Sequence, residues 1–278
     1  MKRTSTRSSH IDDRRGRKMR RGFTGGGLGT IVLLVLALMF GFNPLSFLGI
    51  GGGSSQTQTS SSPAQDDEMK NFISQVLGEN EQIWTQLFAQ IGKQYQEPTL
   101  VLFSGSTPSP CGYAKAAMGP FYCPGDHKVY IDFSFYHELK NKFGAQGDFA
   151  QAYVVAHEVA HHVQTLLGLS DAVNKKKART NKSGQNHLSV RFELQADCLS
   201  GVWAHNTHKR FGTLEQGDIE EALRGAAAIG DDAIQRKTQG FVVPDSFTHG
   251  TGQQRAYWFM EGFKSGQMNS CDTFSSDV

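Results

Sequence analysis

The feature that most constrains the fold is an apolar stretch in the middle of the chain, FAQAYVVAHEVAHHVQTLL, which covers residues 149–167. Asp148 precedes it as a candidate N-cap, with Gln151 at the capping-box position, and Gly168 follows it as a candidate helix end. Because apolar residues occupy most of its circumference, the stretch predicts a helix buried at the centre of a domain.

Three polar residues interrupt this apolar stretch at metal-binding spacing: His157, Glu158 and His161. Histidines four apart on a helix lie on one face, one turn from each other, so both can bind one ion without backbone strain. Glu158 cannot point directly at that ion, but it can reach a water at an open position, as the general base does in the H-E-x-x-H arrangement of a zinc hydrolase. The spacing also arises by chance, but buried imidazoles need partners and the apolar flanks offer few. We therefore expect Zn²⁺ here, with His162 in a structural or supporting role.

A third ligand has to come from another segment. The pattern H-E-x-x-H-x-x-G-x-x-H fails, because Gln164 and Leu167 stand where Gly and His are required. The stretch FELQADC instead offers Glu193 and Asp197, four apart on one helical face among apolar neighbours. Glu193 would complete a His/His/Glu site, and Asp197 would accept the ring N–H of a ligand histidine. The alternative is that both carboxylates are solvated at the surface.

These motifs resemble a known family. H-E-x-x-H followed by E-x-x-A-D is similar to gluzincin metallopeptidases, and distantly to membrane peptidases related to CAAX prenyl proteases and the HtpX heat-shock protease. With CPGDHKVYID, AHEVAHHVQ, ELQADC and HGTGQQR, the chain resembles the bacterial neutral zinc metallopeptidase family from its apolar run onward. The resemblance implies a zincin-like, membrane-tethered or exported domain that binds Zn²⁺ and acts on peptides or proteins.

The same resemblance suggests roles for His249 and Arg255 in FTHGTGQQR. The related membrane peptidases carry T-H-P-x-x-x-x-R with the same spacing. By that likeness His249 would donate to the oxyanion of the tetrahedral intermediate, and Arg255 would pair with Asp197. Gly250 replaces the usual proline, and the alternative is a surface histidine in a glycine-rich loop.

The N-terminal region predicts membrane attachment. Nine basic residues precede Phe23, opposed by only two aspartates, although the whole chain has a net charge of +2. An uncharged apolar run, Gly27–Phe42, follows. We expect a basic arm at 1–22, a transmembrane helix at 23–43, and a Gly/Ser-rich linker at 44–67.

The positive-inside rule then predicts a single-pass protein of the inner (cytoplasmic) membrane, with its N-terminus cytoplasmic and its domain in the periplasm or cell exterior. A cleaved signal peptide is the alternative, although no Ala-x-Ala-like site follows the run. A basic arm can also bind nucleic acid, but the apolar run contradicts that interpretation, and we expect no nucleic-acid partner.

Four cysteines fit an exported domain. Cys111 and Cys123 could close a short loop, and Cys198 and Cys271 would then pair over a long one. The alternative is four unrelated buried thiols. A structural zinc site is not expected, because no C-x-x-C spacing occurs.

Residues 68–278 are expected to form one α+β domain, mostly helical, with a small antiparallel-type sheet before the central helix. Residues 69–92 predict a helix that Gly78 interrupts. Residues 98–105 and 127–136 predict strands, and the second is either a plain sheet strand or an edge strand that binds an extended peptide. Further helices are expected at 188–211, 213–237 and 253–266.

Together these features predict a membrane-anchored zinc endopeptidase that acts on a peptide or protein substrate. The alternative is a non-catalytic zinc-containing binding or adaptor module on a peptidase-like scaffold. The presence of Glu158 favours the enzyme, because such modules often lose the general base.

Overall fold

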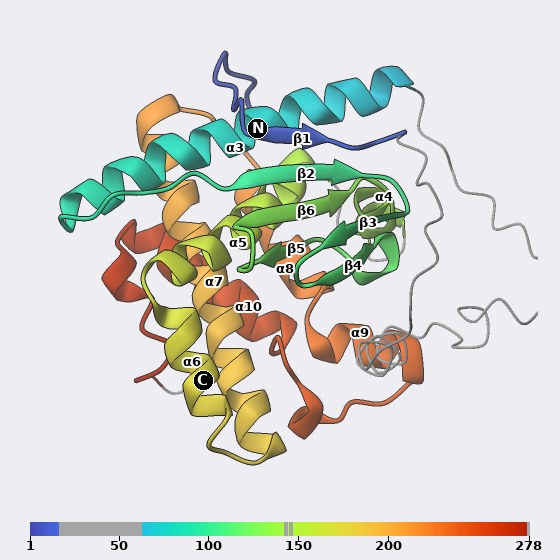
Figure 1. Ribbon diagram of the computed structural model, residues 1–278, viewed down its shortest axis with the longest axis vertical. Coiled ribbons are helices and arrows are strands. Elements are labelled where there is room, and N and C mark those ends of the chain that lie inside the picture. Colours follow the sequence, from blue (N-terminus) through green and yellow to red (C-terminus); the bar gives the residue numbers. More distant parts are fainter. Residues whose placement is uncertain (17–62, 142–143, 145–146, 277–278) are drawn as a thin grey trace, which may run out of the picture.

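The computed structural model describes residues 1–16, 63–141, 144 and 147–276. Helices predominate and surround a small sheet, with α3 (Pro63–Gln90) running along one edge of it (Figure 1), so the expected mostly helical α+β class is confirmed. The helices are α3 (Pro63–Gln90), α4 (Ser134–Asn141), α5 (Asp148–Leu166), α6 (Leu169–Lys177), α7 (Lys182–Phe211), α8 (Asp218–Ala228), α9 (Asp231–Gln239) and α10 (Gly252–Ser265). Short 3-10 turns are η1 (Ala116–Met118), η2 (Pro244–Ser246) and η3 (Met268–Ser270).

The main sheet is mixed, which corrects the antiparallel-type sheet expected. Its order is β1 (Ile11–Asp13), β2 (Thr99–Phe103), β6 (Lys128–Asp132) and β5 (Phe121–Cys123). β1, β2 and β6 run parallel, and only β5 is antiparallel to its neighbour. Parallel neighbours need a long crossover, and residues 104–127 provide one, including the hairpin β3 (Ser106–Ser109) and β4 (Gly112–Lys115).

Several predicted boundaries were wrong. α3 continues through Gly78 without a break, and the strand expected at 127–136 ends at Asp132, where α4 soon begins. The helix expected at 213–237 is two helices, α8 and α9. Asp148 is the first residue of α5, and the N-cap is Gly147. The Asp148 carboxylate instead accepts a hydrogen bond of 2.8 Å from the α-amino group of Met1.

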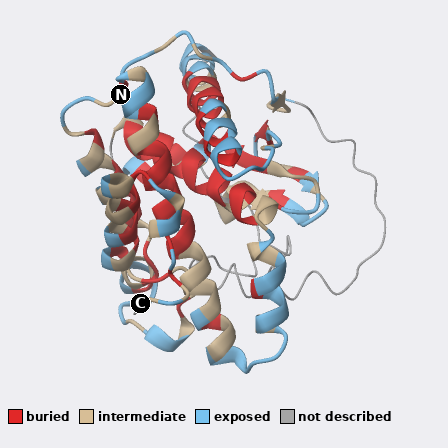
Figure 2. Cartoon of the chain, turned by 90° about the vertical axis from the view of Figure 1, so that its left-hand side faces the viewer, coloured by how far each residue is buried: buried red, intermediate tan, exposed pale blue. Residues whose placement is uncertain are grey.

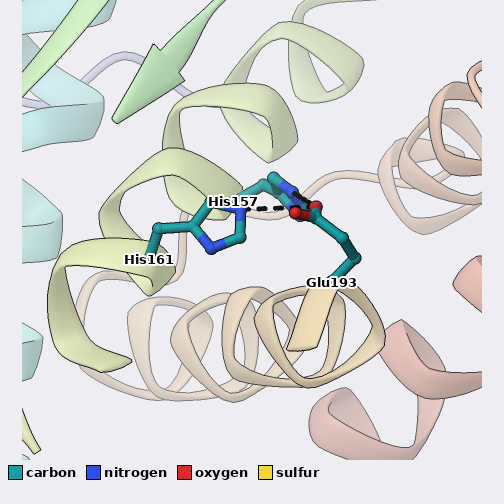
Figure 3. A group of neighbouring side chains, drawn as sticks. All are labelled: His157, His161 and Glu193. Carbon is teal, nitrogen blue, oxygen red and sulfur yellow. Dashed lines mark hydrogen bonds and ion pairs between the residues drawn. The ribbon is translucent and has the colours of Figure 1, made fainter. Parts of the chain in front are cut away.

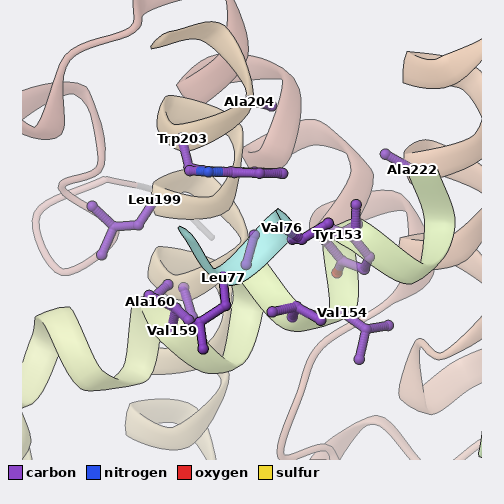
Figure 4. Packing of buried hydrophobic residues seen from close by; sticks show 14 of the residues in the cluster. Val76, Leu77, Tyr153, Val154, Val159, Ala160, Leu199, Trp203, Ala204 and Ala222 are labelled. Atoms are coloured by element: carbon purple, nitrogen blue, oxygen red, sulfur yellow. The ribbon is translucent and has the colours of Figure 1, made fainter. Parts of the chain in front are cut away.

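Helix α5 lies in the core, as its apolar circumference predicts. Buried residues concentrate on the helices at the centre of the molecule, and exposed residues lie on its outer turns (Figure 2). Side chains of three helices meet there (Figure 4): Val159 and Ala160 from α5, Val76 and Leu77 from α3, and Leu199 and Trp203 from α7.

Helices α7 and α10 pack with their backbones in close contact. A Cβ on Gly201 of α7 would lie 2.0 Å from the Phe259 carbonyl oxygen, and one on Gly262 of α10 would lie 1.8 Å from the Cys198 carbonyl oxygen. Only glycine fits at either position. The Cys198–Cys271 disulfide joins α7 to the segment after α10, and Cys111–Cys123 closes the loop before β6, so both expected pairs are present.

The predicted transmembrane helix at 23–43 lies outside the described residues, as do 17–22 of the arm and 44–62 of the linker. None of the helices that the structure does describe has the length and apolar character needed to cross a membrane. The end of the predicted linker, 63–67, is helical and opens α3. Residues 1–16 do not form a separate arm, because they pack on the domain and contribute β1.

Candidate active site

Three side chains from two helices converge at the surface of α5 (Figure 3). His157 and His161 come from α5, and Glu193 comes from α7. Oε2 of Glu193 lies 3.2 Å from Nε2 of His157 and 3.3 Å from Nε2 of His161. The two expected histidine ligands and the expected carboxylate ligand are therefore brought together.

Hydrogen bonds fix the tautomer of each histidine. Nδ1 of His157 lies 2.8 Å from Oδ1 of Asp197 and donates to this buried carboxylate. Nδ1 of His161 lies 2.8 Å from Oε1 of Gln164, whose Nε2 donates to the Phe192 carbonyl and to Gln195. Because the Gln164 oxygen must then be an acceptor, His161 donates to it through Nδ1. Each ring thus presents the lone pair of Nε2 toward Glu193.

This convergence fits a divalent cation. Two nitrogen lone pairs and a carboxylate oxygen repel one another unless a positive charge lies between them. Ligand atoms about 2.0–2.1 Å from a tetrahedral zinc ion are about 3.3–3.4 Å apart, which matches both observed separations. The donor set of two imidazoles and one carboxylate is that of catalytic zinc sites, and we conclude that these residues fit Zn²⁺.

The surroundings of His157 favour a positive charge. Burial lowers its pKa, but the carboxylates of Asp197 and Glu193 raise it to about 9, so without a metal ion Nε2 carries a proton at neutral pH, and binding of a metal ion there releases this proton and exposes the lone pair. Burial would raise the pKa of Glu193, but His161 and His249 hold it well below its usual range. The carboxylate is therefore ionised and available as a ligand.

Asp197 is the centre of a buried ion network behind the histidines. Arg255 of α10 forms a bidentate ion pair with it, with Nε at 2.9 Å and Nη2 at 3.1 Å from the two oxygens. The Tyr153 hydroxyl donates to the same carboxylate at 2.5 Å. Burial would raise the pKa of Asp197, but Arg255 and His157 lower it, so this side chain stays charged. The pairing of Arg255 with Asp197 that the resemblance implied is present in the structure.

A cleft of about 530 Å³ opens over the three ligand side chains. Glu158 lies on its wall, next to His157 on α5, and is only 8% exposed. Apolar side chains make up most of the remaining surface of the cleft, among them Phe121, Phe135, Val154, Val173, Phe192 and Ile229, and polar residues such as Lys177 and Gln235 also line it. A carboxylate beside a candidate metal in such a cleft is positioned for proton transfer.

His249 also lines this cleft, so the structure brings it to the same site. Nδ1 of His249 lies 3.0 Å from the Thr248 hydroxyl and 3.3 Å from Oδ1 of Asp231. The other oxygen of Asp231 accepts backbone N–H groups from Thr248, His249 and Gly250. Partial burial lowers the pKa of His249, but Glu193 and Asp231 raise it more. Asp231 therefore holds both the loop and its histidine in place.

The strand that lies beside the cleft is β5, and β6 is an inner strand of the sheet rather than an edge strand. β6 lies between β2 and β5, so residues 127–136 do not provide the peptide-binding edge weighed above. Within the described sheet β5 is the terminal strand on the side of the cleft, opposite β1, and its residues Phe121 and Tyr122 line the cleft.

His162 links the metal-ligand helix to this strand. Burial lowers its pKa to about 4, so the ring is neutral at neutral pH. Its Nε2 donates to the Gln96 carbonyl at 2.6 Å, and its Nδ1 accepts from the Tyr122 hydroxyl at 3.0 Å. The sequence predicted that His162 is not a metal ligand, and in the structure it lies outside the cluster of His157, His161 and Glu193. Its hydrogen bonds to Tyr122 and Gln96 were not predicted.

Sequence reasoning missed three residues of the site: Tyr153, Gln164 and Asp231. Tyr153 precedes His157 by one helical turn, so helical spacing could have indicated it. Gln164 follows His161 by three residues, which is also a same-face position. Asp231 carries no local signal, because it begins α9 and its partners, residues 248–250, lie in the loop between α9 and α10.

An H-E-x-x-H helix with a glutamate ligand from a second helix and a carboxylate base beside them has the arrangement of a zinc peptidase site. The family comparison agrees with this class and confirms the resemblance. Residues 1–274 match the family described as "Putative neutral zinc metallopeptidase", and the chain belongs to that family.

Two relatives show how far the similarity extends. The chain is 46% identical over 280 residues to the uncharacterized protein YpfJ of Escherichia coli K12, covering 98% of this chain and 97% of that protein. It is 45% identical over 192 residues to the uncharacterized protein Rv2575 of Mycobacterium tuberculosis H37Rv, covering 66% of this chain and 64% of that protein. No solved structure matches the chain.

Proposed function

We propose that this protein is a zinc-dependent endopeptidase in which His157, His161 and Glu193 hold the metal ion. The observation that carries the proposal is the pair of fixed tautomers. Both Nε2 lone pairs face the Glu193 carboxylate inside a cleft that also contains Glu158. A binding module would need the three ligands but not a buried carboxylate next to them.

Zinc, when bound, supplies the Lewis acidity that polarises a scissile carbonyl and makes water nucleophilic near neutral pH. Glu158 takes the proton of the attacking water and delivers it to the leaving amine. His249 donates a hydrogen bond to the oxygen of the tetrahedral intermediate, and Asp231 holds its ring in position. Asp197 keeps His157 in the required tautomer.

The cleft favours extended peptides with apolar side chains. Its lining is mostly aromatic and aliphatic, and the terminal strand β5 runs along it. We propose that a substrate adds to β5 as a further strand, so that backbone hydrogen bonds hold it across the three ligands. Apolar side chains of the substrate then enter the cleft.

Membrane attachment through residues 23–43 stays part of the proposal, since these residues lie outside the described structure. The uncharged run Gly27–Phe42 supports it. Two disulfides in a domain of this size support an exported location.

The test uses the purified full-length protein, zinc analysis and a peptide library read by mass spectrometry. Zinc-loaded wild type should cleave peptides, and a chelator should stop it. Glu158→Gln should retain zinc but lose cleavage by about 10²–10⁴-fold, the usual contribution of a general base. Glu220→Gln, an exposed carboxylate on α8, is the matched control and should cleave normally. Full activity of zinc-loaded Glu158→Gln would overturn the assignment of the base, and absence of zinc from the wild type would overturn the site.

A further inference from the structure

Residues 1–16 are built into the domain through its main sheet. β1 pairs in parallel with β2, with Ile11 opposite Leu100 and Asp13 opposite Leu102. At the two ends of this pairing, Leu100 N–H donates to the His10 carbonyl at 2.8 Å and Arg14 N–H donates to the Leu102 carbonyl at 2.7 Å. In Figure 1 the blue β1 lies directly beside β2, with α3 running along both. Removing β1 would leave this edge of β2 without its partner.

A second contact joins the same segment to α3 at Gly78. A Cβ at Gly78 would lie 2.9 Å from the Arg7 carbonyl carbon and 2.9 Å from Ser8 N, so the backbone can approach only because this residue is glycine. Ser8 N–H donates to the Ser74 carbonyl at 3.0 Å, and the Ser74 hydroxyl donates back to the Ser8 carbonyl at 3.1 Å. The glycine that suggested a helix break is therefore a docking position for the N-terminal segment.

Three arginines of this segment have partners in the domain. Nη1 of Arg15 donates to the Asp66 carbonyl at 3.0 Å, and its guanidinium lies over the Phe133 ring at 4.9 Å. Nη1 of Arg14 donates to the Thr107 hydroxyl at 3.1 Å. Arg3 lies over the Phe72 ring at 4.0 Å. These charges serve contacts within the protein rather than contacts with a membrane surface.

We propose that residues 1–16 and the domain from residue 63 onward fold as one unit in the same compartment, on the exported side. Strand pairing needs backbone groups in direct contact, and a bilayer with a hydrocarbon core of about 30 Å cannot lie between them. A single crossing between residues 16 and 63 would separate β1 from β2, so the membrane attachment proposed for residues 23–43 has to leave β1 and the domain on the same side. The two disulfides place the domain in an oxidising compartment, and β1 goes with it. The positive-inside rule predicts the opposite side for this arm, because it counts every basic residue before Phe23 as a free charge, including Arg3, Arg14 and Arg15, which contact the domain. The inference does not depend on the proposed peptidase activity.

The first test labels single cysteines in full-length protein in intact spheroplasts with a membrane-impermeant maleimide. Ser5→Cys reports on the N-terminal segment and Ala89→Cys on α3, and both positions are exposed. We expect both to be labelled before lysis, to similar extents. Labelling of Ala89→Cys in intact spheroplasts, with Ser5→Cys labelled only after lysis, would overturn the shared compartment. Labelling of both only after lysis would overturn the assignment to the exported side.

The second test uses the sign of a stability change in the purified full-length protein. Alanine in place of glycine inside a helix normally raises Tm, because glycine is the poorer helix former. Gly78→Ala should instead lower Tm, because its Cβ meets the backbone of Arg7 and Ser8. Thr85→Ala, exposed on the same helix, is the control and should leave Tm unchanged or raise it. A Gly78→Ala protein with a higher Tm than wild type would show that the segment is not docked there.

Discussion

Replacing Asp197 by asparagine separates two roles of the buried network. The carboxylate accepts hydrogen bonds from His157, from Tyr153, and from Nε and Nη2 of Arg255. Asparagine keeps one acceptor oxygen, turns the other into a donor and leaves the buried Arg255 without a counter-charge. Breaking a buried ion pair on one side costs about 3–5 kcal/mol, so we expect a loss of this size in the unfolding free energy of the metal-free protein. Loss of a supporting carboxylate typically weakens metal binding by about 10–100-fold, or about 1.4–2.7 kcal/mol.

Denaturant unfolding measures the first quantity, and competition with a zinc chelator measures the second. Asp171→Asn, at an exposed position in the first turn of α6, is the matched control and should change neither. In the double variant Asp197→Asn/Arg255→Met, stability should partly recover, because the unpaired cation is gone. Zinc affinity should stay low, because Nδ1 of His157 still lacks its carboxylate. Wild-type zinc affinity in Asp197→Asn would refute the reasoning.

Three further predictions concern His162, Glu79 and the Cys198–Cys271 disulfide. His162→Phe should lower the unfolding free energy by about 1–3 kcal/mol for each hydrogen-bond partner left unpaired. Because Tyr122 of β5 loses its acceptor, KM should rise more than kcat falls. His162→Gln should partly restore both stability and KM. Burial raises the pKa of Glu79 in the folded protein. The folded state therefore holds a proton that the unfolded chain releases, and stability should fall as the pH rises from about 4.5 through the folded pKa. Glu79→Gln should flatten this slope in urea unfolding between pH 4 and 7, and an unchanged slope would contradict the assignment. Replacing Cys198 and Cys271 by serine removes a disulfide that spans 73 residues and should lower the unfolding free energy by about 4 kcal/mol. Zinc binding should also weaken in the same chelator assay. Unchanged zinc affinity would show that this disulfide does not support the ligand side chains.

Helical periodicity is the reason the cluster of His157, His161 and Glu193 could be predicted from the sequence. His157 and His161 on α5, and Glu193 and Asp197 on α7, are each four residues apart, and a helix turns that spacing into a shared face. The sequence does not show that these faces of α5 and α7 meet, and this had to be inferred from the need of a zinc ion for a third ligand besides the two histidines. These positions need no knowledge of the wider topology.

The sheet could not be predicted in the same way. β1 has the sequence Ile-Asp-Asp, which has little intrinsic strand preference, and its partner lies far along the chain. Its pairing depends on contacts with β2 and α3 that no local pattern encodes. For the same reason Asp231 was missed, since only the folded chain brings it to the loop that carries His249.

The tautomers of both ligand histidines depend on the C-terminal segment of the chain. His157 donates to Asp197, whose charge is held by Arg255 of α10. His161 donates to Gln164, whose amide is oriented by Gln195, and Gln195 in turn donates to the Cys271 carbonyl. Arg255 reaches Asp197 because α10 packs backbone to backbone on α7, and Cys271 is fixed by its disulfide to the same helix. Helix α10 and this disulfide contribute none of the three candidate ligands, yet they help to set which nitrogen of each histidine faces Glu193.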